Sequence, residues 1–302
     1  MSAAEPAARR RVIIDTDAKN EADDQFAIVH ALLTPTFDLR GIVPAHFGTD
    51  RSTRSMEESR EEVDHLLALM GATNHVRVAD GAPHAIPDSG TPVDSPGARL
   101  IIEESLEDDG TLYVAFLGPL TDMASALLLE PSIAARDVVV VWVGGPPYGH
   151  AIPAYEPEFN LRNDRHAADV VFGSGLPIWQ VPMSTYVMMG VGYAELDEKV
   201  APCGPLGEYL VRQVKDWNAA HHAGPIEHRS LGDTPAIGLI MSPDSAVWRA
   251  QDPVRFTDDC GYRRADGGSP IRVAEAVDSR LFLEDFFAKL RAFTRSSSSQ
   301  SD

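Results

Sequence analysis

The stretch Val12-Ile13-Ile14-Asp15-Thr16-Asp17-Ala18-Lys19-Asn20-Glu21-Ala22-Asp23-Asp24 contains an apolar run and then five carboxylates within ten residues. The apolar run predicts a buried strand, and the apolar spacing that follows predicts a helix over residues 21–33. So many like charges stay ionised at close range only when a positive group lies among them. Ligands of open α/β proteins bind at the carboxyl ends of strands, so we expect a binding site here.

The composition restricts the class of protein. The chain has 302 residues, a formal net charge of −19 and a sequence pI of about 4.8, which disfavours nucleic acid and anionic membranes as partners. Cys203 and Cys260 are too few for a disulfide framework or a zinc site. Residues 1–10 contain no apolar signal segment, and no run approaches the length of a membrane span. We therefore expect a cytoplasmic protein.

Strand-like apolar runs alternate with helical patterns through much of the chain. This alternation predicts an α/β fold, with an open, mostly parallel sheet flanked by helices and a Rossmann-like core. The run at 138–143 is apolar throughout, so we expect it to be a central strand covered on both faces. The expected strands are residues 12–15, 39–43, 76–78, 112–116, 138–143 and 178–181.

Helical patterns fill the intervals between the strands and the later part of the chain. Residues 254–273 are strand-like but rich in Gly and Asp, which indicates a hairpin or a small excursion from the sheet. We expect one domain over residues 1–295 and a disordered tail over 296–302. The expected helices are residues 21–33, 56–70, 98–106, 120–129, 164–172, 206–217, 235–241 and 279–293.

Three further segments resemble the opening motif in their position. Leu117-Gly118-Pro119-Leu120-Thr121-Asp122 follows a strand and begins a helix. Glu158-Phe159-Asn160, with Asp164, follows the central strand after a long loop. Leu231-Gly232-Asp233-Thr234-Pro235 introduces another helix. Together with the first motif, these segments place polar groups at one edge of the predicted sheet.

With these four motifs, the sequence resembles the inosine-uridine preferring nucleoside hydrolase family from about Val12 to Met241. The resemblance implies a nucleoside hydrolase-like fold and an enzyme that splits the N-glycosidic bond of ribonucleosides with a tightly held calcium ion. Family members usually carry Asp-Thr-Asp-Pro-Gly-x-Asp-Asp, and here the interval from Asp17 to Asp23 is longer by two residues. A match of several motifs together is specific, whereas any one of them alone is weak.

The resemblance also implies a role for each matched residue. Asp23 corresponds to the general base that deprotonates the attacking water. Glu158 and Asn160 stand in the Glu-Phe-Asn motif, whose side chains hold ribose hydroxyls. The residues that match calcium ligands are Asp17, Asp24, Asp233 and, through its backbone carbonyl, Leu117.

One position departs from the family pattern. The residue before the last metal aspartate is often a histidine involved with the leaving base, and here it is Gly232. The leaving base needs a proton or a stacking partner, and several side chains nearby in the sequence could supply one. These candidates are Trp217, His221, His222 and His228, with Tyr148, His150 and Tyr155 in the loop before Glu158.

The implied chemistry suits these residue types. Carboxylates, a carbonyl oxygen, water and two sugar hydroxyls form the hard oxygen shell that calcium prefers. The cation lowers the pKa of water bound to it, so that a carboxylate such as Asp23 removes a proton near neutral pH. Cleavage passes through a transition state with positive charge on the ring oxygen and the anomeric carbon, which negative groups stabilise.

Plainer interpretations and rival functions stay open at this point. Asp23 or Asp233 could be a helix cap with no further role. Glu158 and Asn160 could likewise form hydrogen bonds within their loop and have no further role. A haloacid-dehalogenase-type phosphatase would use Asp15 as nucleophile, and a non-catalytic homologue would bind nucleoside or sugar without turnover. We favour the nucleoside N-ribohydrolase, acting on a small nucleoside and forming a dimer or tetramer of identical chains.

Overall fold

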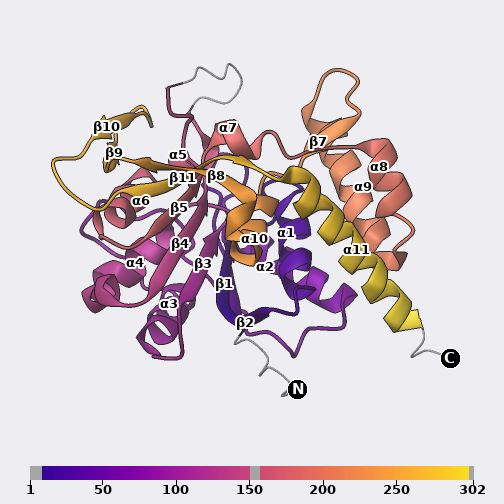
Figure 1. Cartoon of the computed structure of the whole chain (residues 1–302), viewed down its shortest axis with the longest axis horizontal. Coiled ribbons are helices and arrows are strands. Elements are labelled where there is room, and N and C mark those ends of the chain that lie inside the picture. The colour runs from indigo at the N-terminus through magenta and orange to yellow at the C-terminus, as the bar shows by residue number, and fades with distance from the viewer. Residues whose placement is uncertain (1–8, 150–156, 299–302) are drawn as a thin grey trace, which may run out of the picture.

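The computed structural model describes residues 9–149 and 157–298, and in these residues seven strands form one sheet in the order β2-β1-β3-β4-β5-β11-β8 (Figure 1). Neighbours from β2 to β11 are parallel, and β8 is antiparallel at the edge. The predicted fold class is therefore confirmed, with β4 at the centre. The strands are β1 (Arg10–Thr16), β2 (Phe37–Pro44), β3 (Leu112–Phe116), β4 (Val138–Val143), β5 (Ile178–Val181), β8 (Ala246–Gln251) and β11 (Ile271–Val277).

Helices cover both faces of this sheet. On one face α1 (Asp24–Leu32), α10 (Thr234–Met241) and α11 (Ser279–Ser298) contact one another, and α10 also contacts β3 and β4. On the other face α4 (Thr121–Leu129) lies between α3 (Pro96–Leu106) and α6 (Arg165–Gly173). Further helices are α2 (Ser55–Leu69), α5 (Phe159–Asn163), α7 (Met183–Tyr186), α8 (Tyr193–Lys199) and α9 (Gly204–His221), with 3₁₀ turns η1 (Pro131–Ala135) and η2 (Pro243–Ser245).

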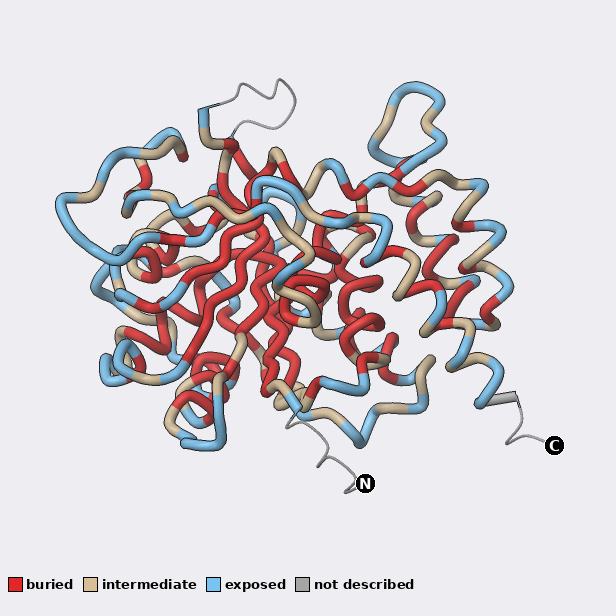
Figure 2. The backbone as a smooth tube through the Cα atoms, in the orientation of Figure 1, coloured by how far each residue is buried: buried red, intermediate tan, exposed pale blue. Residues whose placement is uncertain are grey.

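The alternation of side chains along the strands divides the core into two clusters. In β1, Val12 and Ile14 pack beneath the α1, α10 and α11 face, whereas Ile13 packs on the opposite face with Val114 and Val140. This is the period of two expected for a strand. Figure 2 shows the central strands as continuously buried. The core therefore fixes β1 tightly up to its carboxyl end, where the acidic residues begin.

Several elements differ from the prediction. Helix α1 begins at Asp24 instead of residue 21, because the acidic loop before it is not helical. Residues 76–78 do not form a strand of their own, and only Val78 bridges to Ile42. Strand β8 was not predicted, since its half-exposed pattern is typical of an edge strand and gives a weak signal. Helix α11 continues to Ser298, so residues 296–298 are helical and not a disordered tail, while 299–302 lie outside the described residues.

The segment expected to leave the sheet divides into two parts. Strands β9 (Val254–Phe256) and β10 (Tyr262–Arg264) form the predicted hairpin, but from Ile271 onward the chain returns to the main sheet as β11. Two more short strands, β6 (Gly190–Gly192) and β7 (His228–Ser230), pair with each other. The assignment of residues 1–295 to one domain stays a prediction.

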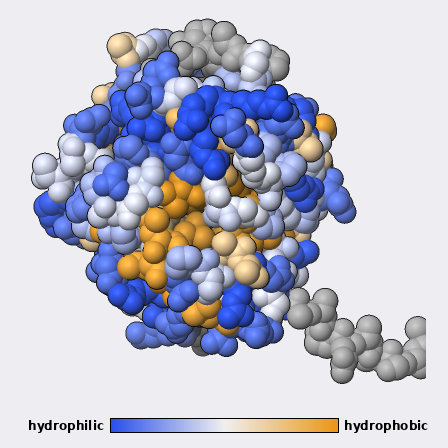
Figure 3. All heavy atoms as spheres, turned by 90° about the vertical axis from the view of Figure 1, so that its left-hand side faces the viewer, coloured by the Kyte–Doolittle hydropathy of each residue, from blue (hydrophilic) through white to orange (hydrophobic). Residues whose placement is uncertain are grey.

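A surface hollow lies on the face formed by α4, α6 and the β9–β10 hairpin. Figure 3 shows apolar side chains gathered on this side of the molecule, with hydrophilic residues around them. The hollow measures about 500 Å³, and Leu127, Val170, Arg255 and Arg263 are among its lining residues. None of the predicted site residues lines it. Concavity alone therefore does not locate the functional site of this protein.

Candidate active site

Three carboxylates from two segments far apart in the sequence meet at the carboxyl edge of the sheet. Asp23 and Asp24 lie where the chain leaves β1 and enters α1, and Asp233 lies directly before α10. One oxygen from each of the three side chains lies within 4.8 Å of the others. Asp23 and Asp233 occupy N-cap positions, yet neither side chain makes a capping hydrogen bond. The interpretation of these two residues as simple helix caps is therefore wrong.

Asp17 and the Leu117–Gly118 backbone lie next to each other. The Asp17 side chain is buried, and its Oδ2 atom has no hydrogen-bond partner among the described residues. A methyl group at Gly118 would lie 2.9 Å from Asp17 Cγ, so the backbone there approaches the carboxylate closely. The Leu117 carbonyl accepts a hydrogen bond of 2.7 Å from Asn160 Nδ2. Three residues predicted from separate motifs are thus contiguous.

The acidic side chains strongly affect one another's ionisation. Burial, assisted by the charges of Glu21 and Asp24, raises the pKa of Asp23 to about 7 although Arg229 acts in the opposite direction. Burial raises the pKa of Asp24 to about 6, against a 2.5 Å hydrogen bond donated by Thr16 Oγ1. The pKa values of Asp17 and Asp233 rise well above the usual range through burial and then through the neighbouring carboxylates. A cation among these oxygens would relieve this cost.

Glu158 is buried and heavily hydrogen bonded. Its two oxygens accept from the backbone N–H groups of Gly145, Asn160 and Leu161 at 2.8 to 3.2 Å, and from the Tyr186 hydroxyl at 3.0 Å. Glu158 therefore caps helix α5, a role that is more specific than the loop hydrogen bonds of the plainer interpretation. Asn160 Nδ2 donates to the carbonyls of Leu117 and Val143. Contact of either residue with ribose stays a prediction.

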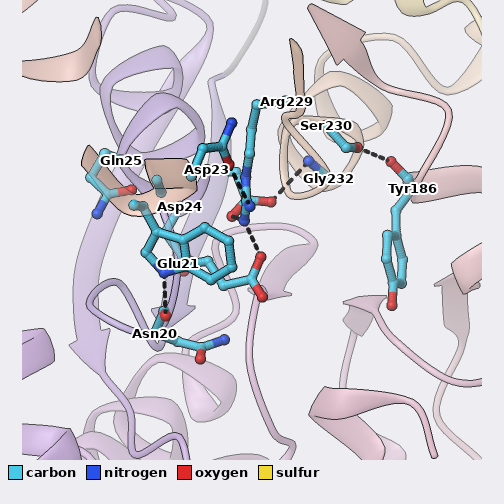
Figure 4. A network of polar contacts seen from close by, with 12 residues as sticks. Asn20, Glu21, Asp23, Asp24, Gln25, Tyr186, Arg229, Ser230 and Gly232 are labelled. Atoms are coloured by element: carbon cyan, nitrogen blue, oxygen red, sulfur yellow. Dashed lines mark hydrogen bonds and ion pairs between the residues drawn. The ribbon is translucent and has the colours of Figure 1, made fainter. Parts of the chain in front are cut away.

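A cationic side chain that the sequence analysis missed lies beside Asp23. Arg229 is 9% exposed; its guanidinium pairs with Glu21 and lies 3.9 Å from Asp23 Oδ1 (Figure 4). The guanidinium also lies 4.1 Å from the centre of the Trp217 ring, and Trp217 Nε1 donates to the Asn20 carbonyl at 3.2 Å. The residues of the longer acidic loop are therefore tied to β7 and α9. The longer interval from Asp17 to Asp23 was visible in the sequence, but no sequence pattern indicated that Arg229 would contact it.

The leaving-group candidates lie in two segments of the sequence, residues 217–228 and the loop before Glu158. Trp217 borders the acidic loop, and His221 stacks on it with ring centres 4.0 Å apart. His222 meets the same ring edge-on, and His228 is exposed in β7. Within residues 9–149 and 157–298, no hydrogen bond or ion pair joins these three histidines to Asp23, Asp24 or Asp233. Tyr148 is described, whereas His150 and Tyr155 lie outside the described residues.

Other acidic residues of the motifs have separate environments. Asp15 is 0% exposed, and neither of its oxygens has a hydrogen-bond partner in the described part of the chain. Asp122 accepts from the Ala82 N–H at 3.1 Å, and Asp164 caps α6 by accepting from Ala167. Full burial of Asp15 excludes it as a nucleophile open to a phosphate ester in this conformation. The phosphatase interpretation is therefore disfavoured, because it requires Asp15 as the nucleophile.

Comparison with known proteins identifies the family of the chain. A family model described as inosine-uridine preferring nucleoside hydrolase matches residues 12–284. A protein of Oryza sativa subsp. japonica named probable uridine nucleosidase 2 is 32% identical, with 90% of each chain covered. One of Arabidopsis thaliana with the same name is 28% identical, over 85% of this chain and 82% of that one. The enzyme class expected from the sequence, a nucleoside N-ribohydrolase, is confirmed.

A solved structure shows the same fold. The purine-preferring ribonucleoside hydrolase from Gardnerella vaginalis superimposes with a TM-score of 0.77 at 22% identity, over 94% of this chain and 99% of that one. In the part of the chain that the structure describes, no helix is both long and apolar enough to cross a bilayer.

Proposed function

Because the chain belongs to the inosine-uridine preferring nucleoside hydrolase family, we propose that it hydrolyses the N-glycosidic bond of a ribonucleoside or related N-riboside with a bound calcium ion. The products are ribose and the free base. The observation that carries this proposal is the convergence of Asp23, Asp24 and Asp233, each with a carboxylate oxygen within 4.8 Å of those of the other two. The names of the relatives differ between uridine and purine preference, so the base is left open.

The donor atoms fit a hard divalent cation. The candidate ligand atoms, from three carboxylates and one backbone carbonyl, are all oxygens, and buried Asp17 Oδ2 has no partner in the described residues. Calcium accepts six to eight such ligands, whereas magnesium demands a stricter octahedral arrangement. We assign Asp17, Asp24, Asp233 and the Leu117 carbonyl as the residues that would hold calcium. When bound, the ion supplies positive charge among the carboxylates and orients the sugar hydroxyls.

Asp23 has a different role in this proposal. It is the carboxylate of the group that retains exposure, with 13% of its side chain accessible, and Oδ2 accepts from the Gly232 N–H at 2.9 Å. This hydrogen bond fixes the carboxylate while Oδ1 can take a proton from the attacking water. Glu158 and Asn160 would hold ribose hydroxyls, which limits the orientations of the sugar ring.

A riboside panel tests the proposed function. Purified protein loaded with calcium is incubated with uridine, cytidine, inosine, guanosine and adenosine, and released reducing sugar is measured with and without a chelator. We expect release from at least one nucleoside, lost on chelation and restored by calcium. Binding of a nucleoside without any release would instead identify a non-catalytic homologue. We also propose a cytoplasmic location and assembly into a dimer or tetramer, the latter measurable by light scattering.

A further inference from the structure

Tyr186, which the sequence analysis did not single out, lies beside Gly232. A methyl group at Gly232 would lie 3.2 Å from Asp23 Oδ2 and 3.3 Å from Tyr186 Cδ2. Tyr186 and Asp23 therefore border the same small volume in front of the glycine. Any larger side chain at position 232 would have to displace one of them.

Several contacts hold the Tyr186 ring in this position. Strand β6 begins at Gly190, four residues after Tyr186, and pairs with β7, which ends directly before Leu231, so the two segments are held together. Ser230 Oγ donates to the Tyr186 carbonyl at 2.7 Å, and the Tyr186 hydroxyl donates to Glu158 Oε1 at 3.0 Å. Figure 4 shows the ring across from Glu21 and Arg229, extending away from Gly232. One end of the ring thus lies near Asp23 and the other at Glu158.

We propose that Tyr186 is the wall against which the leaving base packs. This inference rests on the proposed function. If Asp23 acts on water at the anomeric carbon, that carbon lies beside the Asp23 end of the ring, and the base is attached to it on the face opposite to the water. The sugar then extends toward Glu158 and Asn160. Since the hydroxyl is already donated to Glu158, the aromatic face is the part of Tyr186 that meets the base.

The chemistry of such a wall defines the substrate class. A phenol ring interacts with a planar aromatic base by stacking or edge contact, and such contacts tolerate different bases. The ring makes no comparable contact with free ribose, which has no aromatic face. Tyr186 should therefore contribute to the affinity for N-ribosides of aromatic bases and not to the affinity for ribose alone.

Calorimetric binding tests this assignment. Uridine, inosine and ribose are titrated into calcium-loaded protein that carries Asp23→Asn, so that binding is measured without turnover. Adding Tyr186→Leu should weaken the nucleoside that binds best by about tenfold or more and ribose by less than about threefold. Tyr186→Phe retains the ring and should keep both affinities within about threefold. Tyr193→Leu is the matched control, since the Tyr193 hydroxyl interacts with Asn218 and not with Glu158.

A second variant tests the same position from the other side. Gly232→Ala places a methyl group 3.3 Å from the ring and should weaken nucleoside binding more than ribose binding. Unchanged nucleoside affinity in Tyr186→Leu overturns the inference. Parallel losses for nucleoside and ribose, shared by Tyr186→Phe, also overturn it, because Tyr186 would then only position Glu158. Failure of the wild-type protein to release ribose would refute the proposed function, a result separate from these affinities.

Discussion

Asp23 differs from its acidic neighbours in what it contacts. It is fixed by the Gly232 N–H and lies near Arg229, whereas Asp17 is buried with an oxygen that lacks a partner in the described residues. Our proposal therefore assigns Asp23 as the proton acceptor and Asp17 as a metal ligand. Asp15 is more deeply buried than either residue. Its burial disfavours the phosphatase alternative, which needs Asp15 as an accessible nucleophile.

Replacing Asp23 tests its role as general base. Asp23→Asn keeps the shape and the acceptor for the Gly232 N–H but removes the basic oxygen, so kcat should fall by about 10²- to 10⁴-fold. Calcium affinity, measured by calorimetry, should stay within about fivefold of wild type because Asp23 is not an assigned ligand. A variant that retains wild-type kcat would rule out this role.

The assigned metal ligands should behave differently from Asp23. Asp17→Ala and Asp233→Ala each remove one carboxylate from the calcium shell, so both calcium binding and turnover should be lost. Elemental analysis of the purified variants measures the first quantity and ribose release the second. Full calcium content in either variant contradicts the ligand assignment.

At the scale of helices and strands, the bounds of an element were predicted best where the sequence has a continuous apolar run. The apolar run at 138–143 gave β4 with its observed bounds, and 178–181 gave β5. The motifs at Asp15 and Leu117 were recognisable because a strand end is followed directly by a helix start in each, whereas the motifs at Glu158 and Asp233 were recognised through the family resemblance. Edge strand β8 and the start of α1 were missed, since partial exposure and a dense acidic loop weaken the periodic signal.

The contacts between elements could not be predicted in the same way. The pairing of Arg229 with Glu21 and the position of Tyr186 beside Gly232 depend on how β6, β7 and α7 approach the acidic loop. No spacing in the sequence encodes such tertiary proximity. The resemblance supplied motif residues, but it did not indicate which side chain occupies the space near Gly232.

The β3–α4 connection offers a test at this scale. Gly118→Ala would place a methyl group 2.9 Å from Asp17 Cγ, so the loop or the carboxylate must move. We expect calcium affinity to fall by about tenfold or more, with a smaller effect on chain stability, because one displaced ligand distorts the shell. Gly110→Ala is not a suitable control because of its positive φ, whereas Gly190 has open space and an ordinary φ. Gly190→Ala should therefore leave calcium affinity unchanged, and equal affinities in both variants would contradict the close approach.

At the scale of the whole molecule, the acidic group makes stability depend on pH and metal. Burial raises the pKa of Asp23 to about 7 and of Asp24 to about 6, above the unfolded value of about 4. Such groups bind protons more tightly in the folded state, so their contribution to stability is present at low pH and is lost as pH rises toward 7. On the proposed function, a bound calcium ion would replace the protons and remove this dependence.

Thermal unfolding measures that dependence directly. In chelator, the Tm should decrease between pH 5 and pH 8, and added calcium should raise the Tm most at pH 8. The double variant Asp23→Asn/Asp24→Asn should reduce the slope of the curve in chelator, since neither of these two side chains ionises. A metal-free Tm that increases across this interval would show that the raised pKa values do not control stability.

The central claim is that distant motifs form one calcium site that holds a ribose. A crystal structure of the protein with calcium and ribose tests it most directly. We expect one calcium ion about 2.3–2.6 Å from oxygens of Asp17, Asp24, Asp233 and the Leu117 carbonyl, with two sugar hydroxyls completing its shell. Calcium bound elsewhere, or ribose bound away from these four residues, would contradict it.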